Sequence, residues 1–228
     1  MTYRYYSADR VRDKMPQFKG TDEELQSQLD KLDLLYRSAV KELETKLDIL
    51  SDDFGKKHSY MPIHHVKTRV KTFESIMDKA ERYGIEDPIN NLDVVMKEIY
   101  DIAGIRVITN YEEDIYSMSE LLLQHSDIEL IRVKDYCKNP KESGYRSLHV
   151  VVAIPVFLVK STEIVPVEIQ FRSIAMDTWA SLEHELRYKN RGELSEDIQK
   201  QLKDCATRLH EVDRSMSQIR HKVLSDDI

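Results

Sequence analysis

Apolar residues recur every three or four positions along two long stretches near the ends of the chain. The first stretch carries Leu25, Leu29, Leu32, Tyr36, Ala39, Leu43, Leu47 and Leu50, and the second carries Ile198, Leu202, Cys205, Leu209, Val212, Met216, Ile219 and Val223. This heptad-like spacing predicts two amphipathic helices, the first capped by Thr21 and Glu24. We expect both stripes to pack on the core of their own subunit. Because the stripes are narrow, helix pairing between subunits is the alternative.

Short β-branched runs bounded by turn residues fill the middle of the chain. They predict strands at residues 105–110, 128–136, 149–158 and 165–172. Helical spacing predicts helices at about 66–83, 92–101 and 114–125, and another at 174–189 after the last strand. The predicted fold class is α+β, a mixed β-sheet of about five strands flanked by helices, with long amphipathic helices at both ends. The domain plan is an N-terminal helical arm (1–55), a core (56–190) and a C-terminal helical arm (191–228), together one structural unit.

Composition narrows the class of protein. A chain of 228 residues with a net charge of −7 is not expected to bind nucleic acid in general. Cys137 and Cys205 have neither the spacing of metal ligands nor a disulfide framework. The first residues lack the apolar segment of a signal peptide, and the longest apolar run, 150–159, is too short to span a bilayer. We therefore expect a soluble cytoplasmic protein without a membrane partner.

Polar residues gather where two predicted strands meet turns. The stretch NPKESGYRSLH (139–149) is a polar turn that leads into an apolar strand, and period two places Tyr145 and His149 on one face if the strand extends back that far. By the same count Glu168, Gln170 and Arg172 share a face of the last strand. Each strand by itself is equally well interpreted as a half-buried strand with an exposed polar face.

Two further clusters precede these strands. Arg69 and Lys71 enter the helix predicted at 66–83, and Ser75, Lys79 and Arg82 then follow at three- and four-residue steps on one face. Taken by itself, this cluster is explained better by a solvated helix face than by a binding site. Asp101 stands just before an apolar strand, with Gly104 and Arg106 next to it. A single Asp at such a position is more often a turn or cap residue than a ligand.

Common nucleotide-binding and hydrolase motifs are missing from the sequence. It contains no P-loop, no GxGxxG among its six glycines, no HExxH and no serine nucleophile elbow. A phosphate-binding protein with this sequence would use arginine and lysine side chains and a carboxylate-held metal instead of a glycine-rich loop.

Taken together, four segments resemble the synthetase domain of the RelA/SpoT family, and the whole chain resembles the small alarmone synthetases of the RelP/RelQ kind. The segments are RVKTFESIMDKAER, DIAGIRV, KNPKESGYRSLH and VEIQFRSIAMDTWASLEHELRYK, in the family's order between about residues 60 and 189. The resemblance implies a nucleotidyltransferase-like synthetase fold. It also implies a reaction in which the β,γ-pyrophosphate of ATP is transferred to the 3′-hydroxyl of GDP or GTP, which yields ppGpp or pppGpp and AMP. The oligomeric state that it implies is a homotetramer.

The resemblance also implies a donor half of the site. Arg69 and Lys71 would belong to the ATP site, with Arg69 near the adenine. The ATP phosphates would be held by Ser75, Lys79, Arg82 and Arg106, with Lys134 as a further phosphate contact. Asp101 matches a Mg²⁺ ligand. Glu168 matches the catalytic glutamate, and as a second metal ligand it fits the preference of Mg²⁺ for few carboxylates.

The acceptor half follows in the same way. Tyr145 matches the aromatic residue that stacks on guanine, and Lys141, His149 and Gln170 match the rest of the GDP or GTP pocket. Arg146 would contact phosphate. Asp177 stands where many relatives carry asparagine near the guanine, and an aspartate can also accept hydrogen bonds from that base.

Two other classes of function stay open at this point. A nucleotidyltransferase of the polymerase-β type would use a similar metal-bearing sheet, although its acidic residues generally lie close together on one strand, unlike Asp101 and Glu168. A non-catalytic alarmone sensor or RNA-binding regulator is the other. The joint presence of Asp101, Glu168, Tyr145, Arg69 and Lys71 and the acidic net charge argue against it.

Overall fold

The computed structural model describes residues 22–190 and 194–226. In chain order the elements are α2 (Asp22–His58), β1 (Ile63–Val70), α3 (Phe73–Arg82), α4 (Leu92–Glu98), β2 (Ala103–Thr109), α5 (Glu112–Leu123), β3 (Glu129–Asp135), β4 (Leu148–Phe157), β5 (Thr162–Ser173), α6 (Ile174–Lys189) and α7 (Glu196–Asp226). The expected cap at Thr21 lies outside the described residues, and so does the side chain of Glu24. The α+β class is confirmed.

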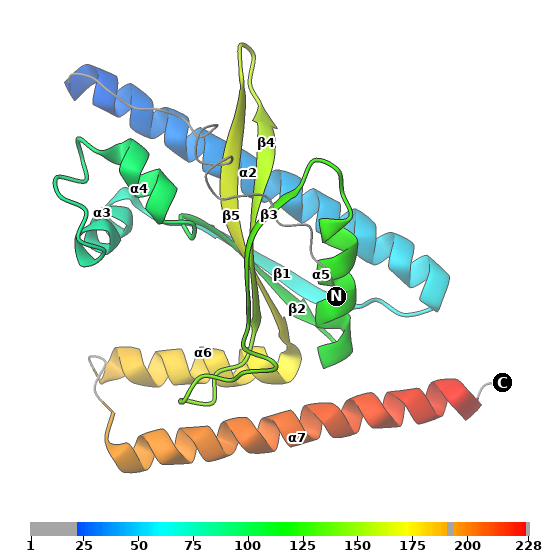
Figure 1. Ribbon diagram of the computed structural model, residues 1–228. Helices are drawn as coiled ribbons and strands as arrows, with labels where there is room; N and C mark the ends of the chain where they lie inside the picture. The colour runs from blue at the N-terminus through cyan, green and yellow to red at the C-terminus, as the bar shows by residue number, and fades with distance from the viewer. Residues whose placement is uncertain (1–21, 191–193, 227–228) are drawn as a thin grey trace.

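One five-stranded sheet organises the molecule (Figure 1). Its strand order is β1-β2-β5-β4-β3, and only the β2–β5 pair is parallel. The predicted mixed sheet of about five strands is therefore correct. The central position of β5 explains its near-continuous burial from Val165 to Val167 and again from Phe171 to Ser173.

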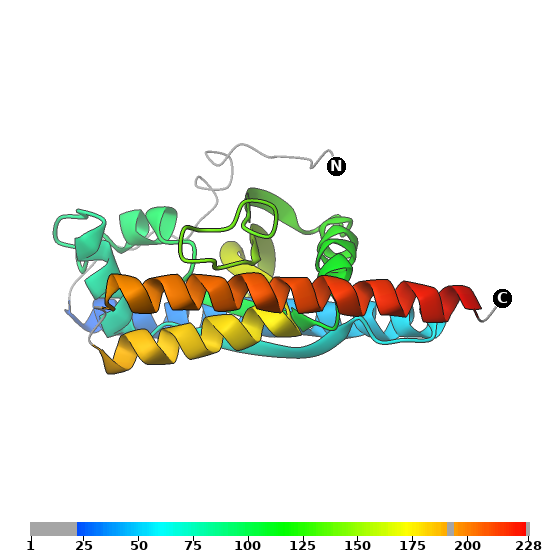
Figure 2. The same ribbon diagram turned by 90° about the horizontal axis from the view of Figure 1, so that it is seen from below.

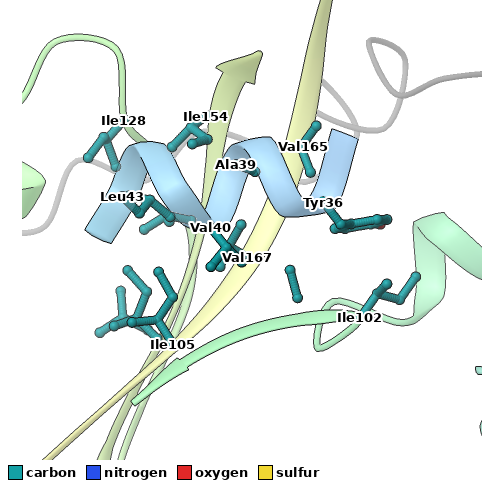
Figure 3. Packing of buried hydrophobic residues seen from close by; sticks show 14 of the residues in the cluster. Tyr36, Ala39, Val40, Leu43, Ile102, Ile105, Ile128, Ile154, Val165 and Val167 are labelled. Atoms are coloured by element: carbon teal, nitrogen blue, oxygen red, sulfur yellow. The ribbon is translucent and has the colours of Figure 1, made fainter. Parts of the chain in front are cut away.

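The long helix α2 crosses one face of this sheet and supplies its cover (Figure 3). Residues of its apolar stripe lie against strand residues in one core cluster: Tyr36, Ala39, Leu43 and Leu47 are fully buried, together with Ile105, Val167 and Ile169 from the sheet. Helix α5 packs on the same side. The prediction that the N-terminal stripe packs on its own subunit is confirmed, and burying such a leucine typically stabilises the fold by about 2–5 kcal/mol relative to alanine.

Helices α6 and α7 lie side by side at the end of the sheet where β5 leads into α6, and α7 runs on past α6 towards α5 (Figures 1 and 2). Trp179 on α6 donates from Nε1 to the carbonyl oxygen of Leu202 on α7 at 2.8 Å. Farther along α7, the Arg220 guanidinium lies over the rings of Tyr60 and Tyr111. These contacts attach α7 to the protein at both ends.

The expectation for the C-terminal stripe is confirmed only for Leu202 and Leu209, which pack against the cluster of Trp179, Ala180 and Ala206. Ile198 and Cys205 are exposed. Val212, Met216, Ile219 and Val223 are all about half exposed. Besides Leu202 and Leu209, the positions of α7 that face the protein include Ala206, which is small, and Asp213 and Arg220, which are polar. Apolar spacing identified the helix but not the buried face of its second half, because polar contacts of Asp213 and Arg220 hold that part of α7.

The helix predicted at 66–83 is also wrong in its first part. Residues 63–70 form the edge strand β1, and only Phe73–Arg82 is helical. In the segment HHVKTRV the residues Val66, Thr68 and Val70 alternate with basic residues, which is a period of two. Thr72 then begins α3 by accepting from the Ser75 amide. Within the described residues, no helix is long and apolar enough to span a membrane.

Candidate active site

Two rows of mostly polar residues cross the sheet face that α2 leaves uncovered. The first row, from β1 to β3, consists of the register partners Lys67, Arg106, Gln170, His149 and Lys134. The neighbouring row consists of Arg69, Gly104, Glu168, Val151 and Arg132. Paired residues of adjacent strands project to the same side of a sheet. The pairing thus brings together residues that are more than 100 positions apart in the chain, such as Lys67 and Gln170.

Glu168 lies at the centre of this face and accepts hydrogen bonds at both carboxylate oxygens. Gln170 Nε2 donates to Oε2 at 2.9 Å, and His149 Nδ1 lies 3.4 Å from Oε1. Burial raises the pKa of this carboxyl, but the contacts with His149, Gln170 and Lys79 outweigh burial and lower the pKa to about 2. Glu168 is therefore an anion at neutral pH.

An aromatic group borders Glu168 on the side of the β3–β4 loop, residues 136–147. The hydroxyl of Tyr145 lies 2.8 Å from His149 Nε2. Its ring meets the rings of Tyr136 and Trp179 at centroid distances of 6.0 and 6.5 Å. The Lys141 ammonium lies 4.8 Å from the Tyr145 ring centroid and 4.9 Å from that of Tyr136. Although β4 begins only at Leu148, the loop still directs Tyr145 to His149, as predicted.

A cationic group borders Glu168 on the other side. Asp101 precedes β2, and its Oδ2 lies 2.7 Å from Lys79 Nζ on α3 and 3.3 Å from Lys71 Nζ after β1. Burial lowers the pKa of the Lys71 ammonium, and Asp101 opposes that effect. This arrangement joins three elements around one carboxylate. It fits the phosphates of a nucleotide, which would compete with Asp101 for both lysines.

A buried ion pair lies beneath the aromatic group. Arg172, 5% exposed, donates from Nη1 to Asp177 Oδ1 on α6 at 3.0 Å. Its Nη2 donates to the Tyr145 hydroxyl at 2.9 Å and to Gln170 Oε1 at 2.8 Å. Arg106 Nη1 lies 3.4 Å from the same Asp177 oxygen. Burial and the charge of Arg172 lower the pKa of Arg106.

Two carboxylates on this face fit a magnesium ion. Within the described residues, no group of three or more His, Cys, Asp or Glu side chains could hold a metal alone. Mg²⁺ usually takes only one or two carboxylates, together with water and substrate phosphates. Asp101 Oδ1 is buried without a hydrogen-bond partner, and such an oxygen is normally satisfied by a ligand, water or ion. Asp101 and Glu168 are thus a chemically suitable pair.

The structure does not bring every predicted residue into the group. Arg146 points away from Tyr145, because its guanidinium donates to the Cys137 carbonyl oxygen at 2.7 Å. Ser75 and Arg82 are exposed on α3; Ser75 contacts Thr72, and Arg82 donates to the Asp78 carbonyl oxygen. Arg69 and Lys134 are exposed at the two sides of the sheet face. Their roles as nucleotide contacts remain predictions.

Three residues that sequence reasoning passed over belong to the same face. Lys67 and Arg132 share the rows described above, and the Arg132 guanidinium lies 5.3 Å from the Tyr100 ring centroid. Arg172 was placed on the face of Glu168 and Gln170 by period two but received no role. The alternation of basic residues in residues 65–71 would have revealed Lys67 if it had been interpreted as a strand.

Comparison with known proteins agrees with this geometry. Residues 68–193 match the family described as the region found in RelA / SpoT proteins. The chain is 43% identical over 191 residues to the GTP pyrophosphokinase YwaC and 37% identical over 188 residues to the GTP pyrophosphokinase YjbM, both of Bacillus subtilis. The alignments cover 83% and 82% of this chain and 89% and 86% of those proteins.

Solved structures give the same result. The crystal structure of small alarmone synthetase 2 from Bacillus subtilis matches with a TM-score of 0.74 at 41% identity, over 83% of this chain and 97% of that one. The structure of small alarmone synthetase 1 from the same organism, bound to its product pppGpp, matches with a TM-score of 0.78 at 35% identity, over 87% of this chain and 99% of that one. Motifs, sheet topology and overall similarity agree, and the chain belongs to the RelA/SpoT family.

Proposed function

We propose that this protein is a (p)ppGpp synthetase, a GTP or GDP pyrophosphokinase of the stringent response. It transfers the β,γ-pyrophosphate of ATP to the 3′-hydroxyl of GDP or GTP and releases AMP. The observation that carries the proposal is the position of Glu168, an anion held between the aromatic group of Tyr145 and His149 and the cationic group of Lys71, Lys79 and Asp101. One side suits a purine acceptor and the other a polyphosphate donor.

The reaction requires that two polyanions lie side by side. A cation about 4 Å from one negative charge offsets roughly 4 kcal/mol of charge repulsion at an effective dielectric near 20. Several cations are therefore needed to hold two polyphosphates together. This face supplies Lys71 and Lys79 near the donor side, Lys141 near the acceptor side, and Arg106 next to Asp177. Holding both nucleotides in line is worth roughly 7–11 kcal/mol as effective molarity.

During transfer the acceptor 3′-oxygen forms a bond to the β-phosphorus, and the bond from that phosphorus to the α,β-bridging oxygen breaks. The bridging oxygen leaves with AMP and keeps the electron pair, while the 3′-hydroxyl loses its proton. With a pKa of about 2, Glu168 is a weak base, so it orients the hydroxyl and accepts the proton only as the new bond forms. Asp101 and Glu168 would hold Mg²⁺, which neutralises phosphate charge when bound.

The direct test is incubation of the protein with ATP, GDP and magnesium, followed by separation of the nucleotides. A pyrophosphokinase yields ppGpp and AMP in equal amounts. A nucleotidyltransferase of the polymerase-β type would instead release pyrophosphate, and a non-catalytic binding protein would leave both nucleotides unchanged. Either of those results would refute the proposal.

The cellular location, the absence of membrane and nucleic-acid partners, and the oligomeric state are proposals as well. We place the reaction in the cytoplasm and expect no membrane or nucleic-acid partner, which the net charge of −7 supports for nucleic acid. We also propose a homotetramer in which the exposed stripe of α7 (Val212, Met216, Ile219 and Val223) is covered by another copy. A continuous apolar stripe on a monomer exposes surface that association would bury.

A further inference from the structure

Arg172, Tyr145, His149, Glu168 and Gln170 form a closed ring of hydrogen bonds. One branch runs from Arg172 Nη2 through the Tyr145 hydroxyl to His149 and then to Glu168 Oε1. The other runs from the same Arg172 nitrogen through the Gln170 amide to Glu168 Oε2. The ring therefore joins the residue that faces the guanine to both oxygens of the predicted catalytic carboxylate.

Arg172 and Glu168 fix the direction of every bond that they themselves make in this ring. A guanidinium can only donate, and a carboxylate can only accept. Gln170 must consequently present its oxygen to Arg172 and its nitrogen to Glu168. In the neutral imidazole, His149 carries its proton on Nδ1 towards Glu168 and accepts at Nε2 from the Tyr145 hydroxyl, which itself accepts from Arg172.

Asp177 lies outside the ring, but it is the counter-ion of Arg172. Its Oδ1 is 3.0 Å from Arg172 Nη1, and its side chain is 10% exposed. A buried guanidinium needs such a partner, because an unpaired buried charge is strongly unfavourable. The pair also fixes the plane of the guanidinium, so that Nη2 points at both Tyr145 and Gln170.

We infer that Asp177 and Arg172 are positioning residues, and that Asp177 acts on the acceptor nucleotide through Arg172 instead of reading the guanine base. The inference rests on the proposed function and revises the role that the family resemblance implies for Asp177. Asp177 Oδ1 already accepts from Arg172 Nη1 and lies 3.4 Å from Arg106 Nη1, and the side chain is only 10% exposed, so little of this carboxylate is left for a base. The effect on the acceptor is indirect: the pair holds the Tyr145 ring and aligns Glu168 through the ring of hydrogen bonds.

The first test compares GDP with inosine diphosphate, which lacks the 2-amino group of guanine. In Asp177→Ala we expect kcat/KM for both acceptors to fall about 10- to 100-fold, in parallel, because a charged hydrogen bond is lost without change in base recognition. Asp177→Asn should restore most activity, since its amide oxygen can still accept from Arg172. A residue that reads guanine would give a different result: the preference for GDP over inosine diphosphate would collapse, and that outcome would overturn the inference.

The second test is a double-mutant cycle with Arg172→Gln. If Asp177 acts through Arg172, the double variant Asp177→Ala/Arg172→Gln should lose no more activity than Arg172→Gln alone. Additive losses would contradict the inference. Thermal unfolding of each variant identifies loss of folding, and Arg172→Lys replaces Arg172→Gln if the latter does not fold. Lysine keeps the charge but cannot hold three acceptors in the same fixed fork.

Binding measurements separate this inference from the proposed function. Trp179 is the single tryptophan and lies next to Tyr145, so its fluorescence reports acceptor binding without turnover. If the wild-type protein makes no ppGpp, the proposed function fails. In that case GDP and inosine diphosphate can still be compared as ligands by fluorescence titration, and this comparison decides whether Asp177 reads the base. Parallel weakening in Asp177→Ala supports the inference, and selective weakening of GDP refutes it.

Discussion

At the scale of residues, Glu168 lies between the two groups of side chains that we propose to bind the donor and the acceptor. Replacing it with glutamine keeps its size but removes its charge and one acceptor oxygen. We expect Glu168→Gln to bind ATP and GDP nearly normally and to lose turnover by about 100-fold or more. Single-turnover kinetics and separate binding titrations would check this. Near-normal turnover would show that the carboxylate has no catalytic role.

The low pKa of Glu168 also predicts how stability depends on pH. Its value of about 2 in the folded protein lies below the ordinary value of 4.5, so the ionised form favours folding. This contribution, roughly 3 kcal/mol, is present above pH 4.5 and disappears as the pH falls towards 2. The difference in unfolding free energy between wild type and Glu168→Gln should thus shrink between pH 5 and pH 2.5. Urea denaturation at both pH values measures it, and a constant difference would contradict the assignment.

Tyr145 allows the ring and the hydroxyl to be tested separately. Stacking on a base is worth about 1–3 kcal/mol, so Tyr145→Ala should weaken GDP binding roughly 5- to 150-fold and leave ATP binding largely intact. Tyr145→Phe keeps the ring but removes the contacts with Arg172 and His149. It should retain most GDP affinity and lose turnover. Equal losses of ATP and GDP binding in Tyr145→Ala would count against two separate nucleotide sites.

At the scale of elements, the β3–β4 loop is held in place by α7. Gly144 has a φ of +93°, and a Cβ built there would lie 2.6 Å from Ala206 Cβ. The adjacent cluster of Trp179, Ala180 and Ala206 also contacts Tyr145. The position of the loop that carries Tyr145 and Lys141 therefore depends on close packing against the C-terminal helix.

Gly144→Ala should accordingly raise KM for GDP without changing KM for ATP. The substitution combines backbone strain of roughly 1–2 kcal/mol with a clash that moves the loop away from α7. Gly84→Ala is a matched control: φ is +73° there, but nothing lies within 4 Å of the added Cβ. Steady-state kinetics with each nucleotide varied in turn would check both variants. A similar effect of the two substitutions would mean that strain alone is responsible.

At the scale of the whole molecule, the second half of α7 presents Asp213 and Arg220 to its own subunit and its apolar stripe to solvent. If another copy covers this stripe, Met216→Asp should dissociate the proposed homotetramer, because a buried unpaired carboxylate is unfavourable. Gln218→Asp introduces the same charge at another exposed position of α7 and should leave assembly unchanged. Light scattering coupled to size-exclusion chromatography measures the mass. A wild-type protein that runs as a monomer would refute the proposal.

The sequence by itself determined most of the secondary structure and the family of this protein. Strand and helix periodicity, which is local, predicted four of the five strands and the helices around them. The motifs around Asp101, Tyr145 and Glu168 predicted the family, because each keeps its residues together in the chain. Strand alternation also placed Arg172 beside Glu168 and Gln170. The edge strand β1 was missed because its alternation is weak and basic, and the helical spacing of the residues that follow it was extended backwards.

Only the tertiary structure decided how these pieces act together. The pairing of β1, β2, β5, β4 and β3 aligns the two polar rows, and strand pairing is non-local, so no local pattern predicts it. The ring from Arg172 to Glu168 depends on distances of about 3 Å between residues from a loop, two strands and, through Asp177, a helix. The buried face of α7 was likewise decided by Asp213 and Arg220. In the last two cases a buried polar group took the place required by its charge and hydrogen-bond partners, which hydrophobic periodicity does not record.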